Sequence, residues 1–232
     1  MLFPEAIRAQ KPCAISFPSD RLIEWECYQI KRGETPLALF GEYTEAVLRF
    51  NRIDQRHIWS GKYLKVPHDL AMAVNFTPMP SFLEHAKPYT KYILINLDEQ
   101  FLGAYEYGNL VLSFPIASGR GSSTSKGIFK VLGRDKNHRS SLYTIEKTRI
   151  PYPMYWGIKF YVSKKGVAFW IHSRDIPGYP ASHGCIGLYD EEMQKKYYGA
   201  PQQPLLNDSK KLYLWLFPHK ENDERPYEYP KD

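Results

Sequence analysis

The segment WIHSRDIPGYPASHGCIGLYD, residues 170–190, carries the residues on which the predicted fold and function depend. Its apolar start predicts a strand that delivers His172, and Pro177 and Pro180 predict a loop after that strand. Cys185 follows His172 by thirteen residues, directly after a second histidine and a glycine. The segment therefore brings one thiol and two imidazoles into the same part of the chain.

These residue types suggest nucleophilic catalysis. A thiol with its ordinary pKa of about 8.5 is mostly protonated at neutral pH, so a base or cation is expected to hold Cys185 as a thiolate. His172 is the candidate base, because a strand fixes its backbone and one hydrogen bond can aim its ring. Gly184 would let backbone N–H groups face a developing oxyanion. Two alternatives stay open: a turn beside a core cysteine, and a zinc site that would need Asp175 or Asp190 as fourth ligand.

Composition narrows the class of protein. The 232 residues are 43% hydrophobic and 24% charged, which fits a globular chain and not a disordered one. There are 31 Lys and Arg against 25 Asp and Glu, a net charge of +6 that favours anionic partners without naming one. No apolar run approaches the roughly 18 residues of a membrane span, so none is expected. The first residues lack a basic and then apolar leader, which fits either a cytosolic protein or one whose leader has been removed.

The chain has three cysteines. In an oxidising compartment Cys13 and Cys27 could form a disulfide and leave Cys185 as a free thiol. The alternative is that Cys13 and Cys27 are two small buried apolar residues.

The second half of the chain shows mainly β patterns. Three apolar runs separated by short turns predict an antiparallel meander. The runs are residues 91–97, 101–107 and 110–117. Further strands are predicted at 127–132, 166–172 and 211–217. One helix is predicted from Asp190 as N-cap to Gly199, and the charged tail 218–232 is predicted to be solvated.

Residues 28–67 have a strand, helix, strand pattern that resembles a LysM module. The matching positions are Tyr28, Ile30, Gly33, Glu34, Thr35, Asn51, Ile58, Gly61, Leu64 and Pro67. The resemblance implies a small β-α-α-β fold that binds glycan containing N-acetylglucosamine. Because Pro36 departs from the usual pattern, a degenerate module that only packs on its neighbour is the alternative. Residues 68–90 have three prolines and no clean period, which predicts a linker.

The stretch from His172 to Leu188 resembles the signature of YkuD-type L,D-transpeptidases: a histidine on a strand, a loop, and then Ser-His-Gly-Cys. The segments ASGRGSSTSKGIFKVLGR (117–134) and IPYPMYWGIKF (150–160) follow in the order of that family, and the resemblance covers residues 91–217. It implies that Cys185 is the acylated nucleophile and His172 the general base, with the Ser173 carbonyl orienting its ring. Backbone N–H groups of His183, Gly184 and Cys185 would form the oxyanion hole, and the His183 side chain would shape the pocket.

Substrate contacts are predicted less directly. Ser182 belongs to the signature, whereas Tyr152, Tyr155 and Trp170 could line the donor groove or belong to the core. At position 187 this chain has glycine where the family usually has arginine or asparagine, and we expect Arg174 to replace the missing charge. From residue 120 to 174 there are twelve Lys or Arg and two acidic residues, which predicts a basic approach surface for a carboxylate-rich stem peptide, or only a solvated surface.

The sequence thus predicts a mainly β protein with five parts: an N-terminal segment (1–27), a LysM-like module (28–67), a linker (68–90), a catalytic domain (91–217) and a tail (218–232). The resemblance implies a periplasmic or secreted, cell-wall-associated enzyme that forms 3–3 cross-links between peptidoglycan stems, releases D-Ala and needs no metal or organic cofactor. Its partners would be stem peptides and glycan strands, with no nucleic acid. Alternatives are an L,D-carboxypeptidase, a lipoprotein-anchoring acyltransferase and a catalytically silent wall-binding protein.

Overall fold

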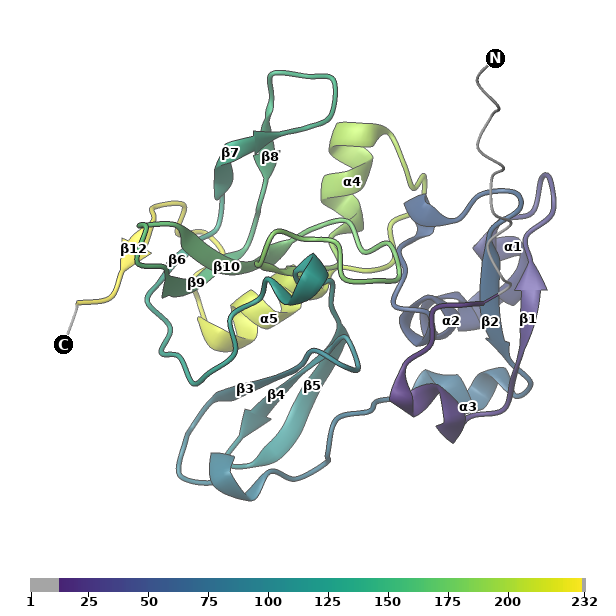
Figure 1. Ribbon diagram of the computed structural model, residues 1–232, viewed down its shortest axis with the longest axis horizontal. Helices are drawn as coiled ribbons and strands as arrows, with labels where there is room; N and C mark the ends of the chain where they lie inside the picture. The colour runs from purple at the N-terminus through teal and green to yellow at the C-terminus, as the bar shows by residue number, and fades with distance from the viewer. Residues whose placement is uncertain (1–12, 231–232) are drawn as a thin grey trace, which may run out of the picture.

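The computed structural model describes residues 13–230, in which a small N-terminal unit lies beside a larger β-rich body (Figure 1). Two sheets, a projecting hairpin and two helices make up most of the body. No helix within the described residues has the length and hydropathy needed to span a membrane. The mainly β class predicted for the second half of the chain is confirmed.

The predicted meander is confirmed as a three-stranded antiparallel sheet. Its strands are β3 (Tyr92–Asn96), β4 (Phe101–Glu106) and β5 (Asn109–Pro115). Aromatic and β-branched residues favour these strands, and Gly108, with φ of +85°, makes the tight turn between β4 and β5.

The second sheet has five strands in the order β11, β10, β9, β6, β12. They are β6 (Gly133–Asp135), β9 (Gly157–Val162), β10 (Ala168–Ser173), β11 (Ile186–Leu188) and β12 (Tyr227–Glu228). Only β10 and β11 pair in parallel. A separate hairpin of β7 (Arg139–Thr144) and β8 (Pro151–Pro153) projects from the body next to α4 (Figure 1).

The C-terminal tail is largely exposed, as the sequence predicted, and it is also attached to the body. Strand β12 pairs with β6, and the carboxylate of Asp223 accepts a hydrogen bond from the Arg134 guanidinium at 2.8 Å. This pairing covers the edge of the five-stranded sheet.

Helix α4 (Glu191–Tyr198) begins and ends as predicted. The Asp190 carboxylate accepts a hydrogen bond from the Met193 N–H at 2.9 Å, and Gly199 ends the helix in the left-handed conformation. The predicted strand at 211–217 is wrong, because these residues lie in and just beyond helix α5 (Asp208–Leu216), whose N-cap is Asn207. The helix buries Leu212 and Tyr213, which lie one turn after the buried Asp208 and Ser209.

The predicted strand at 127–132 is also wrong, since these residues form no strand. Ile128 is 92% exposed and Gly127 has φ of +150°, so this apolar run has no buried face to pair. Regular pairing starts at β6, after the Leu132 N–H donates to the Lys159 carbonyl at 2.7 Å.

The N-terminal unit, residues 25–67, has the element order that the resemblance to a LysM module implies. It contains β1 (Trp25–Gln29), α1 (Pro36–Phe40), α2 (Thr44–Phe50) and β2 (Tyr63–Pro67), with β1 and β2 antiparallel. The Thr35 hydroxyl caps α1, and Pro36 occupies its first turn, where a proline is tolerated. The predicted linker includes a short helix, α3 (Leu70–Val74), that packs against α2 and β2. Short 3-10 segments occur at Pro18–Leu22, Gly41–Tyr43, Gln55–His57, Glu84–Ala86 and Arg120–Ser122.

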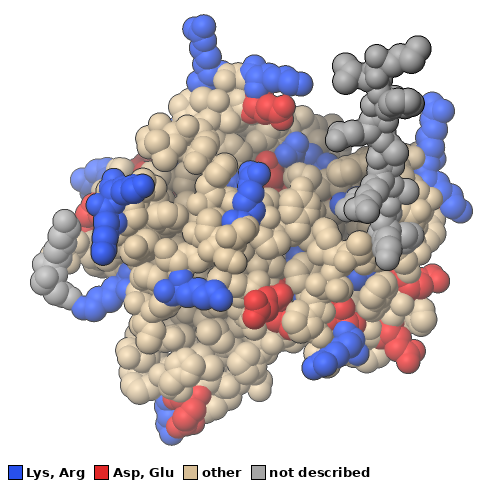
Figure 2. Space-filling view, in the orientation of Figure 1, with Lys and Arg blue, Asp and Glu red and all other residues tan. Residues whose placement is uncertain are grey.

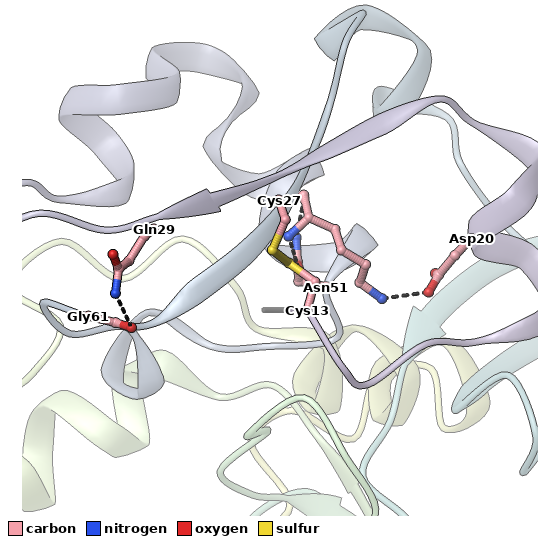
Figure 3. Close-up of a disulfide and its surroundings, with 7 residues drawn as sticks. Cys13, Asp20, Cys27, Gln29, Asn51 and Gly61 are labelled. Atoms are coloured by element: carbon pink, nitrogen blue, oxygen red, sulfur yellow. Dashed lines mark hydrogen bonds and ion pairs between the residues drawn. A yellow bond between two sulfur atoms is a disulfide. The ribbon is translucent and has the colours of Figure 1, made fainter. Parts of the chain in front are cut away.

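Cys13 and Cys27 form a disulfide that ties the N-terminal segment to β1 (Figure 3), and Cys185 is free. Nearby, the fully buried Arg52 guanidinium pairs with Asp20 at 3.0 Å and with Glu99 at 3.4 Å. These two carboxylates come from the N-terminal segment and from the turn before β4, so the buried ion pairs join three parts of the chain.

Two hydrophobic cores hold the molecule together. The larger one packs the meander, the five-stranded sheet and α5 around residues such as Phe114, Ile171 and Leu212. The second core is shared: Val47 and Ile53 of the N-terminal unit pack with Ile176 and Tyr189 of the body. The N-terminal unit therefore packs firmly against the body.

Candidate active site

Strands β10 and β11 set the positions of the candidate base and nucleophile. In the parallel register His172 is opposite Gly187 and Ile171 is opposite Ile186, so Trp170 and Cys185 lie side by side one residue earlier. Side chains alternate between the two faces of a strand, which puts the side chains of Cys185, Trp170 and His172 on the same face of the sheet. We call it the site face. The opposite face carries the isoleucines into the core.

The His172 ring has a fixed orientation. It is 2% exposed, and its Nδ1 lies 2.7 Å from the Ser173 carbonyl oxygen, the partner that the resemblance implied. A carbonyl can only accept a hydrogen bond, so Nδ1 carries the proton and Nε2 has a free lone pair in the neutral ring. Burial, followed by the positive charge of Arg174, lowers the pKa of His172 to about 3. The imidazole is therefore neutral at pH 7 and able to accept a proton.

Two glycines flank His172 on the site face. A Cβ atom on Gly187 would lie 2.6 Å from Cδ of Arg174, and one on Gly157 would lie 3.2 Å from Cβ of His138. The stem of Arg174 thus fills the space that a side chain at position 187 would need. His138 lies in the same way over Gly157. The His172 ring is therefore enclosed between the side chains of Arg174 and His138.

The turn that carries Cys185 is held by hydrogen bonds. Ser182 Oγ donates to the Cys185 carbonyl at 2.6 Å and accepts from the Gly184 N–H at 2.9 Å. Gly184 has φ of +136°, and a Cβ there would lie 2.4 Å from the Phe169 ring, so no larger residue fits. Because the Gly184 N–H already has an acceptor, the N–H groups of His183 and Cys185 are the better candidates for an oxyanion hole. Ser182 holds this turn through its hydroxyl and is itself buried.

The Cys185 thiol is partly exposed. Burial raises its pKa above the ordinary value, while a hydrogen bond from the Trp170 backbone and the charge of Arg174 lower it by less. Burial thus opposes charge on both His172 and Cys185, which does not favour the thiolate that the sequence led us to expect.

Arg174, through its positive charge, affects the pKa values of several groups in the site. Besides its effects on His172 and Cys185, it lowers the pKa of His183, where burial is the largest cause. Its Nη2 donates to the Ala181 carbonyl at 3.0 Å, whereas its Nε is buried and has no hydrogen-bond partner among the described residues. One donor of the guanidinium thus has no protein acceptor.

His183 extends outward from the turn. Its exposed ring stacks on Tyr143 of β7, with centroids 4.4 Å apart and planes 9° apart. This stack links the Cys185 turn to the β7–β8 hairpin and places His183 at the rim of the site, not beneath the sulfur.

The three predicted aromatic residues divide between core and surface. Trp170 is buried and stacks on His138 at 4.0 Å, and the Tyr152 hydroxyl donates to the Asp175 carboxylate at 3.3 Å, so both are held inside the protein. The Tyr155 hydroxyl lies 2.5 Å from that of Tyr197, on the side of the hairpin. Of the three, Tyr155 has the most accessible polar group.

Sequence reasoning missed His138. Its Nδ1 lies 3.0 Å from the Asp135 carboxylate, and its charge would further lower the pKa of His172. The Asp-x-x-His spacing was visible, but only the pairing of β6 with β9 shows that His138 lies over Gly157. Among residues 13–230, no cluster of three or more His, Cys, Asp or Glu side chains could hold a metal ion.

On the face that Figure 2 shows, basic residues are spread out and do not gather in one patch. Figure 2 shows Lys and Arg side chains distributed over much of one face, with several acidic side chains toward the lower right. A cavity of about 350 Å³ lies elsewhere, lined in part by Gln29, Trp59, Lys62 and Pro177, and it includes none of the predicted site residues.

One family model and several solved structures are similar to this chain. The family model of the L,D-transpeptidase catalytic domain, YkuD, matches residues 90–203. An L,D-transpeptidase structure from Stackebrandtia nassauensis is 18% identical over 75% of this chain and 61% of that one, with a TM-score of 0.39. One from Xylanimonas cellulosilytica is 25% identical over 73% of this chain and 91% of that one, with a TM-score of 0.40. No curated protein matched.

The match to the family model leaves out the N-terminal unit, and this chain spans less than two thirds of the Stackebrandtia protein. Within residues 90–203 the match includes Cys185, His172 and the turn between them. Residues 90–203 therefore match the YkuD L,D-transpeptidase catalytic domain, the family that the sequence resembles.

Proposed function

We propose that this protein is a peptidoglycan L,D-transpeptidase that works through a thioester on Cys185. The observation that carries the proposal is the parallel register of β10 and β11, which puts Cys185 and His172 on one face, with the histidine Nδ1 bonded to the Ser173 carbonyl. Nε2 of a neutral imidazole is then free to take the thiol proton, as nucleophilic catalysis requires.

The proposed reaction has two acyl transfers. Cys185 Sγ loses its proton to His172 Nε2 and attacks the carbonyl carbon of the third stem residue; the bond to D-Ala then breaks, and the leaving amine takes the proton from His172. The amine of a second stem next attacks the thioester and gives a proton to His172, which returns it to the departing sulfur. N–H groups of His183 and Cys185 are the proposed donors to the oxyanion in both steps.

Arg174 is the proposed contact for an anionic group of the donor stem. Its stem occupies the space above Gly187, and its charge acts on the pKa values of His172, His183 and Cys185. A guanidinium suits a carboxylate. We propose that the exposed His183 ring, which stacks on Tyr143, and the Tyr155 side chain line the approach to Cys185.

We place the protein in the periplasm or outside the cell, at the wall. The disulfide between Cys13 and Cys27 supports an oxidising compartment. The element order of residues 25–67 supports glycan binding by a LysM-like module, which remains a proposal because the family match starts at residue 90.

Acylation by a carbapenem tests the chemistry. Intact-protein mass spectrometry should show one adduct on the wild type and none on Cys185→Ala, and an unmodified wild type would favour a silent wall-binding protein. Muropeptide analysis with and without an added acceptor stem then separates cross-linking from L,D-carboxypeptidase activity. A lipoprotein acceptor would be indicated by transfer to a lysine peptide and not to a stem. Unchanged turnover in His172→Ala would refute the assignment of the base.

A further inference from the structure

The loop between the two candidate catalytic residues is held by the N-terminal unit. Asp54, which follows α2, is fully buried. Its Oδ2 accepts a hydrogen bond from the Ile176 N–H at 2.6 Å, and its own N–H donates to the Ile176 carbonyl at 2.8 Å. Ile53 also forms an antiparallel bridge with Pro177. The N-terminal unit thus pairs with the loop backbone almost as a strand would.

A second set of contacts fixes the residue next to Arg174. The Asp175 carboxylate forms an ion pair with Arg56 at 2.9 Å and accepts from Gln194 Nε2 at 3.1 Å. The same Gln194 amide donates to Asp54 at 2.7 Å. Arg56 therefore supplies the cation that balances Asp175, and the neighbouring Arg174 does not have to.

Burial makes these contacts strong. Ile53 and Ile176 belong to one hydrophobic core, and the Tyr189 hydroxyl, directly after β11, donates to the Ile53 carbonyl at 3.2 Å. Polar contacts in such surroundings are costly to leave unmade. Arg174 itself is anchored to β11 because its N–H donates to the Leu188 carbonyl at 2.9 Å. The start of the loop, at Arg174 and Asp175, is thus held by β11 and by the N-terminal unit.

We propose that Asp54 and Arg56 are positioning residues for the active site: they hold the loop so that Arg174 lies over Gly187, with Asp175 paired to Arg56. The proposal rests on the function proposed above for the same site. It gives the N-terminal unit a part in acylation that does not depend on glycan binding.

A soluble probe separates the two roles of the unit. The rate of Cys185 acylation by a carbapenem, which contains no glycan, should fall about tenfold or more in Arg56→Ala and in Asp54→Ala, because small misplacements of a site are costly. Arg56→Lys keeps the cation and should recover part of the rate. Trp59→Ala changes an exposed aromatic of the same unit and is the matched control, with a rate equal to that of the wild type.

A second readout does not need enzymatic activity. Because Arg174 lowers the pKa of Cys185, its displacement in Arg56→Ala should move iodoacetamide alkylation of Cys185 to higher pH. Hydrogen exchange at the Ile176 amide should accelerate in Asp54→Ala, which removes the acceptor of that N–H. Thermal unfolding confirms that each variant is folded. The proposal is overturned if both variants keep wild-type acylation and alkylation profiles, or if Trp59→Ala is slowed equally. If the wild type forms no adduct, the proposed function fails, and the alkylation profile and amide exchange still decide the positioning role.

Discussion

The pH dependence of Cys185 reactivity tests the electrostatics of the site most directly. The perturbation is pH, and the assay is the rate at which iodoacetamide, a small neutral electrophile, alkylates the sulfur. Only the thiolate reacts at an appreciable rate, so the rate follows the ionised fraction. Cys185 is the only free thiol among the described residues, since Cys13 and Cys27 are paired.

The magnitude follows from the two pKa values. At an ordinary pKa of about 8.5, roughly 3% of a thiol is ionised at pH 7. Burial raises the pKa of Cys185, so its ionised fraction is lower still. Burial also lowers the pKa of His172 to about 3, so both shifts oppose transfer of the Cys185 proton to the imidazole. The neutral thiol and neutral imidazole are therefore the favoured resting forms.

We expect the alkylation rate to rise about tenfold per pH unit from about pH 6 to 8.5, without a plateau near neutrality. Arg174→Gln should slow alkylation at every pH in this range, because loss of the cation raises the pKa of Cys185. Cys185→Ala is the control and should not react. A rate that is already maximal at pH 6 to 7 and falls only below pH 5 would show a preformed ion pair and refute this reasoning.

Three further predictions concern packing and stability. Gly187→Ala should reduce carbapenem acylation about tenfold or more, because the new Cβ displaces the stem of Arg174; a wild-type rate would contradict this. Arg52→Met should lower the free energy of unfolding by about 3–5 kcal/mol, measured by urea titration, because it removes the buried cation that pairs with Glu99 and leaves Lys65 as the cation beside Asp20; a loss below about 1 kcal/mol would argue against it. Replacing Cys13 and Cys27 by alanine opens a loop with a sequence separation of 14 and should cost about 3 kcal/mol, with the carbapenem adduct still formed.

Local signals in the sequence predicted the elements that local contacts determine. The meander and helix α4 came from alternating apolar residues, from turn residues and from the Asp190 cap. The strand predicted at 211–217 failed because a continuous apolar run fits a buried helix as well as a strand. The cap that decides between them, Asn207, lies four residues before that run, and its side chain accepts a hydrogen bond from the Lys210 N–H.

The site could be predicted only where its residues are close in sequence. Cys185 and His172 belong to one short motif, so their type and order were readable. The place of His138 depends on the register of β6 against β9, and the pairing of Arg56 with Asp175 depends on how the N-terminal unit packs. The effect of burial on the pKa of Cys185 could not be read from the motif for a related reason, since burial is a property of the folded chain.

Because His172 and Cys185 are neutral at rest, a negative charge on the substrate could promote proton transfer between them. His172 stays neutral because it is buried and because Arg174 opposes a second positive charge nearby. A carboxylate bound to Arg174 would offset that charge, so the pKa of His172 would rise when the donor stem is in place. Proton transfer from Cys185 to His172 would then be less costly while the donor stem is bound. Between turnovers the sulfur would stay a less reactive thiol. Because Arg56 balances Asp175 and leaves Arg174 free for this contact, the N-terminal unit would share in controlling when the nucleophile ionises.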